Sequence, residues 1–517
     1  MDDQSTTKIS AAEQHSSAWS LLSSWLLAPV PAGSLGIVRV VLGLAFCYWS
    51  LHYLISGRAE LLCDPRDFHF TWPGFDWVRP WPGGGMQIQF GMMAVAGVFL
   101  ACGFLTHLSN LVVAFGITHF FFIDRTNYQN HYYLLILISW SSLLLPLYRI
   151  WSFDSFLDST TRLRYIARFN LLIVQFHAAL PYVFGGISKF DSDWLSSRPM
   201  RFLLVQKFQI SPESELAIVG GFVLAWGGLL FDLLIVPCLL WNRTRSAAWL
   251  LLLTFHLTNA ILFPIHIFPW LMIGLSTVFL PPDWPATIWG LLSGCREQAS
   301  TETLQVPCGA SPCSTRFRLI VVAAACYCLF HLAWPLRPFI YPDPVGWTER
   351  GHYFSWRMML RGKATGVQYF LTNPSTRETW AADISRFLHS EQAARFSMDP
   401  EMIRQLAAAL AETHFAQTGD RPEVRVLALS SLNGRRPQLL VDPMTNLAAE
   451  PPWPQRRPWI MPLTEPLPTV PWRAPVEHWQ ALIKLPPLPW QNEISRNSSV
   501  SQSSIQERNY AHGFGKN

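Results

Sequence analysis

Long apolar stretches are the feature that most constrains the fold of this chain of 517 residues. A helix needs about 20 predominantly apolar residues to cross a membrane, and the first two-thirds of the sequence holds about nine such stretches. They cover residues 35–55, 86–105, 108–123, 131–148, 167–187, 216–241, 247–263, 268–280 and 317–336. The fold class predicted is therefore mainly α, a polytopic helical membrane bundle.

The composition changes after this region. Charged residues make up 14% of the chain, against about 25% in soluble proteins, and the deficit lies before residue 337. Beyond it, residues 367–371 and 424–429 alternate as strands do, and residues 400–416 follow the spacing of an amphipathic helix. We expect four parts: residues 1–34 with an interfacial helix, the membrane bundle 35–336, a mixed α/β domain 337–490 and a disordered tail 491–517.

Charge gives the expected orientation and excludes one class of partner. Basic residues cluster between Arg162 and Arg168, in a loop on the same side as the N-terminus. The excess of positive charge on cytoplasmic loops then predicts a cytoplasmic N-terminus and an extracytoplasmic, periplasmic or lumenal, C-terminal domain. A net charge of +5 without a long basic run argues against nucleic acid as a partner. The spacing of Cys295, Cys308 and Cys313 fits no zinc pattern, so no metal is expected.

Several polar side chains lie within or beside the predicted spans. Ionisable groups are costly at membrane depth, so each is a functional candidate. On the predicted topology, segments 124–131 and 189–194 both lie at the extracytoplasmic face, and the span with His256 and Asn259 runs toward it. These groups therefore converge at one depth, as expected for a site that opens outward. Asp232, inside the sixth span, is expected to be structural and to hold helices together.

Two of these residues allow two interpretations. Burial disfavours the charged form of an amine, so Lys189 at a membrane boundary could act as a general base. Alternatively, it extends toward water and pairs with Asp191 or Asp193. His131 either orients a reacting group or is an ordinary hydrogen-bonded histidine at the start of a span. The residues alone leave both questions open.

Four segments, in order, carry a resemblance to a known family. They are DRTNYQNHY at 124–132, GISKFDSDW at 186–194, FHLTN at 255–259 and FSWRMM at 354–359. Together they resemble the vitamin K-dependent gamma-glutamyl carboxylase family, whose membrane domain is shared with the horizontally transferred transmembrane domain group. The resemblance covers most of the chain apart from the N-terminal segment and the tail. Ser188 departs from the pattern, because some members have a second lysine there.

The resemblance implies a reaction in the carbon-carbon lyase, or carboxylase, class. A lysine deprotonates reduced vitamin K, which reacts with O2 and collapses to the epoxide through an alkoxide. The alkoxide removes a γ-proton from a peptidyl glutamate, and the carbanion adds CO2. The cofactor would be the hydroquinone of vitamin K or a menaquinol, with no metal. The partners would be the lipid bilayer, the quinol and a Glu-containing peptide or protein.

The resemblance also implies residue roles. Lys189 and His131 would be catalytic, which favours the functional interpretation of both. The quinone- or substrate-binding residues would be Asn130, Asn127, His256, Asn259 and Trp356. The structural residues would be Asp191, Asp193, Trp194 and Asp232. Two alternatives remain: a quinol epoxidase that carboxylates no peptide, and a transporter or lipid-binding membrane protein without redox chemistry.

Overall fold

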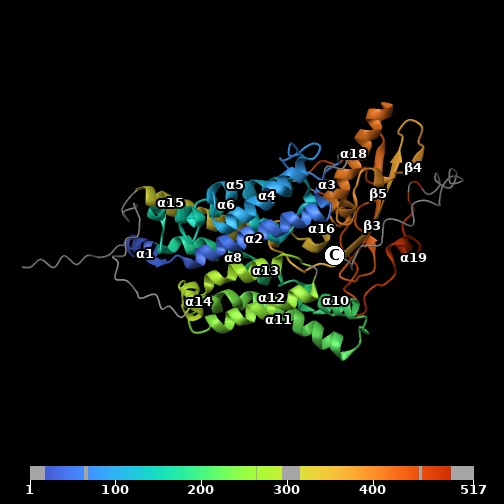
Figure 1. The fold of residues 1–517 in the computed structure, drawn as a ribbon. Helices are drawn as coiled ribbons and strands as arrows, with labels where there is room; N and C mark the ends of the chain where they lie inside the picture. Colours follow the sequence, from blue (N-terminus) through green and yellow to red (C-terminus); the bar gives the residue numbers. More distant parts are fainter. Residues whose placement is uncertain are drawn as a thin grey trace, which may run out of the picture.

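The computed structural model describes residues 18–62, 68–263, 265–293, 315–452, 457–488 and 490. Helices run side by side in an elongated bundle, and the strands β3 (Lys363–Thr372), β4 (Thr379–Ala381) and β5 (Glu423–Leu432) lie together at one end of it (Figure 1). The predicted disordered tail and the three clustered cysteines, Cys295, Cys308 and Cys313, lie outside the described residues.

Among the described residues, six helices are long and apolar enough to cross a membrane, which confirms the predicted polytopic helical bundle. They are α2 (Gly33–Ile55), α4 (Gly85–Cys102), α5 (Thr106–Ile123), α8 (Arg168–Ser188), α11 (Glu215–Leu240), and α15 (Thr315–Ala333) with its extension η5 (Trp334–Ile340). The remaining expected spans are helices of the same bundle that fall short of this combined criterion. They are α6 (Asn130–Ser142), α12 (Arg245–Leu262) and α13 (Phe268–Ser276).

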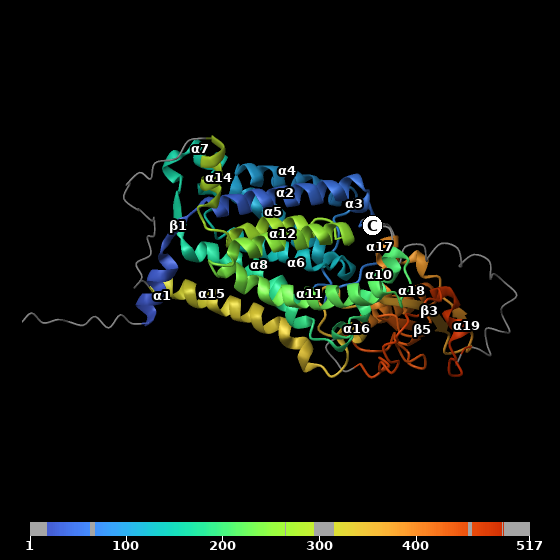
Figure 2. The same ribbon diagram turned by 90° about the horizontal axis from the view of Figure 1, so that it is seen from below.

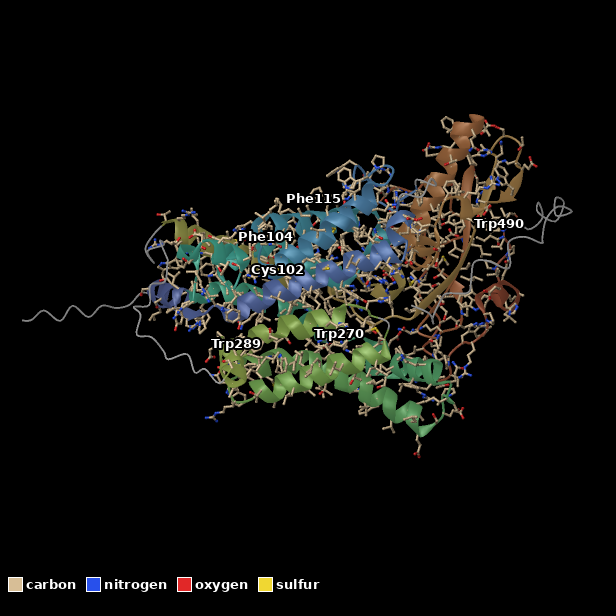
Figure 3. The ribbon with its side chains drawn as sticks, in the orientation of Figure 1. Cys102, Phe104, Phe115, Trp270, Trp289 and Trp490 are labelled. Carbon is tan, nitrogen blue, oxygen red and sulfur yellow. The ribbon has the colours of Figure 1, made fainter. Side chains whose placement is uncertain are left out.

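The outer surface of the bundle is apolar, as contact with lipid requires. Phe115, Trp270 and Trp289, labelled in Figure 3, are all exposed. Helix α15 runs along one side of the bundle (Figure 2), and only 11% of the residues in its apolar 18-residue stretch are buried. At the end remote from β3 and β5 lies α1 (Ala18–Leu27), which exposes Trp25 as an interfacial helix would. The short strands β1 (Pro29–Pro31) and β2 (Tyr165–Ala167) pair antiparallel at this end.

Two glycines bring α2 and α4 into backbone contact. A Cβ atom at Gly97 would lie 2.6 Å from the amide nitrogen of Cys47, and one at Gly43 would lie 2.3 Å from that of Ala101. Small residues permit this approach, which gives membrane helices the close packing that a lipid environment does not otherwise drive. The helix pair therefore depends on the absence of side chains at these positions.

The C-terminal domain is built on an antiparallel sheet with the strand order β4-β3-β5-β6. Its strands are β3 (Lys363–Thr372), β4 (Thr379–Ala381), β5 (Glu423–Leu432) and β6 (Gln438–Leu439). Helix α18 (Pro400–Thr418) buries Leu406 and Leu410 in the same apolar cluster as Val424 and Val426 of β5. The predicted strands at 367–371 and 424–429 and the helix at 400–416 are therefore confirmed.

Buried polar contacts fix this domain to the bundle. Asp193, in the short helix α9 (Ser192–Leu195), accepts hydrogen bonds at 2.6 and 2.7 Å from the two terminal nitrogens of Arg435. Arg125, which follows α5, pairs with Asp399 at 2.9 Å, and Asp124 accepts a 2.8 Å hydrogen bond from Gln392. Bidentate, charge-assisted contacts have strict geometry, so they fix the domain in one orientation over the membrane helices.

Candidate functional site

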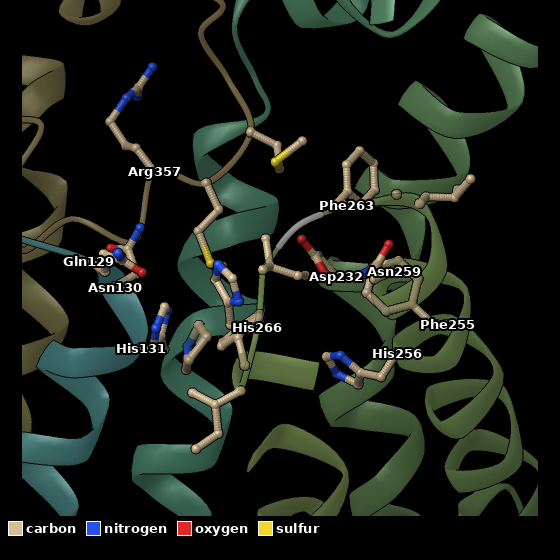
Figure 4. Close-up of a pocket in the computed structure, with 18 of the residues that line it drawn as sticks. Gln129, Asn130, His131, Asp232, Phe255, His256, Asn259, Phe263, His266 and Arg357 are labelled. Atoms are coloured by element: carbon tan, nitrogen blue, oxygen red, sulfur yellow. The ribbon is translucent and has the colours of Figure 1, made fainter. Parts of the chain in front are cut away.

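A cavity of about 650 Å³ lies where the bundle meets the C-terminal domain. The membrane side of its wall comes from α2, α6, α8, α11 and α12, together with the segment 265–268. The opposite side comes from segments 352–361 and 391–395 of the C-terminal domain. Figure 4 shows His131 and His256 on opposite sides of this space, with His266 between them and Arg357 nearer the C-terminal domain.

Lys189 lies in the wall of this cavity and is 6% exposed. It follows the last residue of α8, and its amine forms an ion pair with Asp232 of α11. The amine also donates a 3.2 Å hydrogen bond to the carbonyl oxygen of Gly185 and lies 5.2 Å from the centre of the Trp194 ring. The side chain does not extend into water, and its acidic partner is neither Asp191 nor Asp193.

Those two aspartates hold the segment that follows Lys189. The carboxylate of Asp191 caps α9 by accepting hydrogen bonds from the amides of Asp193 and Trp194 at 3.1 and 3.4 Å. Asp193 binds Arg435, as described above, and the indole nitrogen of Trp194 donates to the carbonyl of Ala225 on α11 at 2.8 Å. These contacts are of the kind that a structural role requires.

Hydrogen bonds orient polar groups on both sides of the cavity. On α12, Nε2 of His256 lies 2.6 Å from the hydroxyl of Tyr182, while its Nδ1 has no hydrogen-bond partner within the described part of the chain. Asn259, one turn further along α12, lines the same wall. At the start of α6, the hydroxyl of Tyr128 donates to the side-chain oxygen of Asn130 at 2.9 Å, next to His131. The cavity thus has oriented polar groups on the walls formed by α6 and α12.

The C-terminal domain gives its side of the cavity a cationic character. Arg357, Arg361 and Arg395 line this side. Burial lowers the pKa of Arg357, and the carboxylate of Asp191, 3.5 Å away, acts in the opposite direction. Glu391 is the only acidic residue of this domain in the described wall. Sequence reasoning missed these arginines, since they are distant in sequence from the membrane segments and belong to no span.

Two predicted binding residues lie outside the described cavity wall. The side-chain amide of Asn127 donates a 2.9 Å hydrogen bond to the carbonyl of Phe120, at the end of α5. Trp356 is 1% exposed and packs against the ring of Tyr133, with 5.0 Å between their centres. The contacts of both residues are with the protein, and their predicted part in binding stays a prediction.

Two protein families match this chain in succession. The HTTM domain family matches residues 27–284, and the lumenal domain of vitamin K-dependent gamma-carboxylase matches residues 316–466. The chain belongs to the vitamin K-dependent gamma-carboxylase family. No solved structure matches this carboxylase family member. With its six apolar helices and a lumenal-type domain, it is an integral membrane protein whose C-terminal domain is extracytoplasmic.

Membership of the carboxylase family implies the use of reduced vitamin K, and the cavity suits such a ligand. Phe255, Phe263 and Phe268 supply apolar walls for a lipophilic ring, while His256 retains an unpaired buried nitrogen that faces no protein partner in the described chain. A mostly apolar cavity with a few convergent polar groups is the usual form of a site for a small organic molecule. In the described residues, no group of three or more His, Cys, Asp or Glu is placed to hold a metal ion.

Proposed function

We propose that the protein couples oxygenation of reduced vitamin K, to the epoxide, with carboxylation of peptidyl glutamate. The observation that supports this most is the place of Lys189, an amine buried in the wall of a cavity that membrane helices and the extracytoplasmic domain share. A buried amine in a cavity that histidines also line suits proton transfer from a phenol. The arginines of the extracytoplasmic side suit a substrate carboxylate.

The proposal assigns different tasks to the two sides of the cavity. Reduced vitamin K, when bound, supplies the reducing power and the strong base that the carboxylation requires. On the membrane side, Lys189 accepts the quinol proton and Asn130 with His131 holds the quinone oxygens, while His256 and Asn259 bind from α12. Bilayer and helices together keep water away from reactive species. The aspartates 191 and 193 with Trp194 keep the lysine segment in place.

The proposal includes the arrangement of the chain in the membrane. The N-terminus would be cytoplasmic, residues 1–34 would precede the bundle 35–336, and residues 337–490 would form the extracytoplasmic domain. Under this arrangement the quinol enters laterally from the bilayer, and the Glu-containing peptide arrives from the extracytoplasmic side.

Two assays on one preparation test the proposed function. Purified protein in lipid nanodiscs is supplied with reduced vitamin K, oxygen, labelled bicarbonate and a Glu-containing peptide. We expect both the epoxide and labelled carboxyl groups on the peptide. Epoxide without labelled peptide would instead identify a quinol epoxidase, and the absence of both products would favour a transporter or lipid-binding protein.

A matched pair of variants tests the base. Lys189→Ala should abolish epoxide formation, whereas Lys484→Ala removes an exposed lysine of the extracytoplasmic domain and should leave it unchanged. Near-normal turnover by Lys189→Ala would refute the assignment of this residue as the base.

A further inference from the structure

The ion pair between Lys189 and Asp232 joins two helices on the cavity wall, and it bears directly on how a proton is accepted there. The two side chains are 7% and 8% exposed. We propose that they act as one proton-accepting dyad, in which Asp232 is the positioning residue that enables Lys189 to take a proton from a bound phenol. This inference rests on the proposed function, because it names the proton acceptor of that site.

Of the three hydrogen-bonding directions of the Lys189 amine, one is left open toward the cavity. An ammonium group has three N–H donors. Two of its directions are taken by Asp232 and by the carbonyl oxygen of Gly185. The ring of Trp194 flanks the nitrogen, and a Cβ atom at Gly228 would lie 3.9 Å from Cε of Lys189. The third direction is therefore the one left for a ligand in the cavity.

The proton count explains why a carboxylate is needed. A lysine that already carries three protons has no lone pair and cannot accept another. Beside Asp232, however, the resting pair is an ammonium and a carboxylate, neutral overall, and the proton between them can pass to the carboxylate. When a phenol O–H bond breaks, its proton binds the amine as the shared proton settles on the carboxylate. The products are a phenolate and a dyad of charge +1, so protons and charge balance.

Burial supports this exchange. In water the charged form of such a pair is favoured by solvation, whereas a buried pair loses most of that solvation. The charged and neutral arrangements thus become closer in energy, which allows the shared proton to move. Asp232 is the only aspartate in the described cavity wall, where Glu391 is the other acidic residue.

Other titratable and charged groups face the same cavity as the dyad. Tyr182, on the same helix as Lys189, directs its hydroxyl to His256 of α12. His131 and His266 line the wall, and Arg357 adds a positive charge from the extracytoplasmic domain. These neighbours shape any pH dependence of the site, so the test compares variants that differ only at position 232.

The first test compares Asp232→Asn with Asp232→Glu by epoxide formation. The asparagine variant keeps the size of the side chain but cannot take a proton, and we expect its kcat to fall about 100-fold, in the range of general acid–base catalysis. Its KM for reduced vitamin K should change little, and Asp232→Glu should recover a substantial part of the rate. Raising the pH should also restore Asp232→Asn, because alkali ionises the phenol in solution without a protein base. Wild-type kcat and an unaltered pH profile in Asp232→Asn would overturn the proposal.

The second test is independent of turnover. Reduced vitamin K is added to the wild-type protein under nitrogen, so that no oxygenation occurs, and infrared difference spectra are recorded with and without ¹³C-labelled aspartate. We expect a new, isotope-sensitive carbonyl band of a protonated aspartic acid that Asp232→Asn lacks. The absence of this band would overturn the dyad even in a protein that forms epoxide. Its presence in a protein that forms none would uphold the dyad and refute the proposed function.

Discussion

The hydroxyl oxygen of Tyr182 and the Nε2 atom of His256 lie 2.6 Å apart and join α8 to α12 across the cavity wall. Both side chains are almost completely buried, at 3% and 1% exposed. Because Lys189 directly follows α8, this contact relates the orientation of the imidazole to the helix that positions the amine.

Tyr182→Phe should weaken quinol binding. The change leaves a buried imidazole nitrogen without its partner, which costs about 1–3 kcal/mol. Because the imidazole of His256 then loses its fixed orientation, we expect the cost to weaken quinol binding. The KM for reduced vitamin K should rise about tenfold, since 1.4 kcal/mol corresponds to a factor of ten. Tyr48→Phe, on the same wall but 55% exposed, is the control. Equal KM values for the two variants would contradict a role of Tyr182 in orienting His256.

Lys189→Arg should preserve the charge of the site and remove its function. A guanidinium group still pairs with Asp232, but it does not give up its proton in proteins. Epoxide formation should therefore fall by about 100-fold or more, while the protein retains its thermal stability. Chromatographic measurement of epoxide gives the rate, and a rate within a few-fold of wild type would show that positive charge alone is sufficient.

Asp399→Asn should destabilise the protein in a pH-dependent manner. Burial alone raises the pKa of Asp399, but Arg125, Arg457 and a hydrogen bond from Tyr353 outweigh it and leave the pKa below its ordinary value of 3.8. A folded-state pKa below the unfolded value means that the carboxylate stabilises the fold at higher pH and loses this contribution as pH falls through the folded pKa. At neutral pH the variant leaves Arg125 buried without its charge partner, at a cost of about 3–5 kcal/mol.

Thermal unfolding in detergent, followed by tryptophan fluorescence, measures this effect. The difference between Asp399→Asn and wild type should be large at neutral pH and shrink below about pH 4, where the ordinary carboxyl group is protonated. Asp383→Asn is the control, because it removes the charge of an exposed pair with Arg386, and such pairs contribute little. The amide oxygen of asparagine can still accept the hydrogen bonds from Ser385 that Asp383 accepts. A difference that did not vary with pH would point to lost packing and not to lost charge.

Gly97→Ala should separate α2 from α4. The added methyl group would lie 2.6 Å from the amide nitrogen of Cys47 and 2.7 Å from the carbonyl of Gly43, and neither backbone atom can move freely. Overpacking of this kind costs about 1–3 kcal/mol. Gly91→Ala on the same helix is the matched control, because a Cβ atom there meets nothing within 4 Å and alanine favours the helix by up to about 1 kcal/mol. The temperature of thermal unfolding should therefore fall for Gly97→Ala and should stay the same or rise for Gly91→Ala.

The length and position of the membrane helices could be predicted from the sequence because the bilayer imposes one length on apolar segments. The prediction was less accurate at α6, which ends earlier than expected at Ser142 and is followed by Pro146. Helix α13 continues as the 3-10 helix η4 (Thr277–Phe279), close to the expected end at residue 280. The strands β3 and β5 could be predicted because alternate side chains point to opposite faces of the sheet, one of which packs against α18.

The partners of the site residues were harder to predict. The sequence placed Lys189, His131 and His256 at one depth, and all three line the cavity. It offered Asp191 and Asp193 as partners of the lysine because they are near in sequence, whereas the structure selects Asp232, 43 residues away. An acid alone in an apolar span needs a cationic partner, so Asp232 carried a signal of its own. The choice among partners depends on helix packing, which no local pattern contains.

Segments 352–361 and 391–395 close the cavity that the membrane helices begin. A protein with only the first of the two matched regions would contain the counterpart of Lys189 but would lack the segments that cover the cavity on its extracytoplasmic side. In such a relative the cavity would open directly to the aqueous compartment. Under the proposed function, water would then react with the oxygenated quinol before it could meet a peptide.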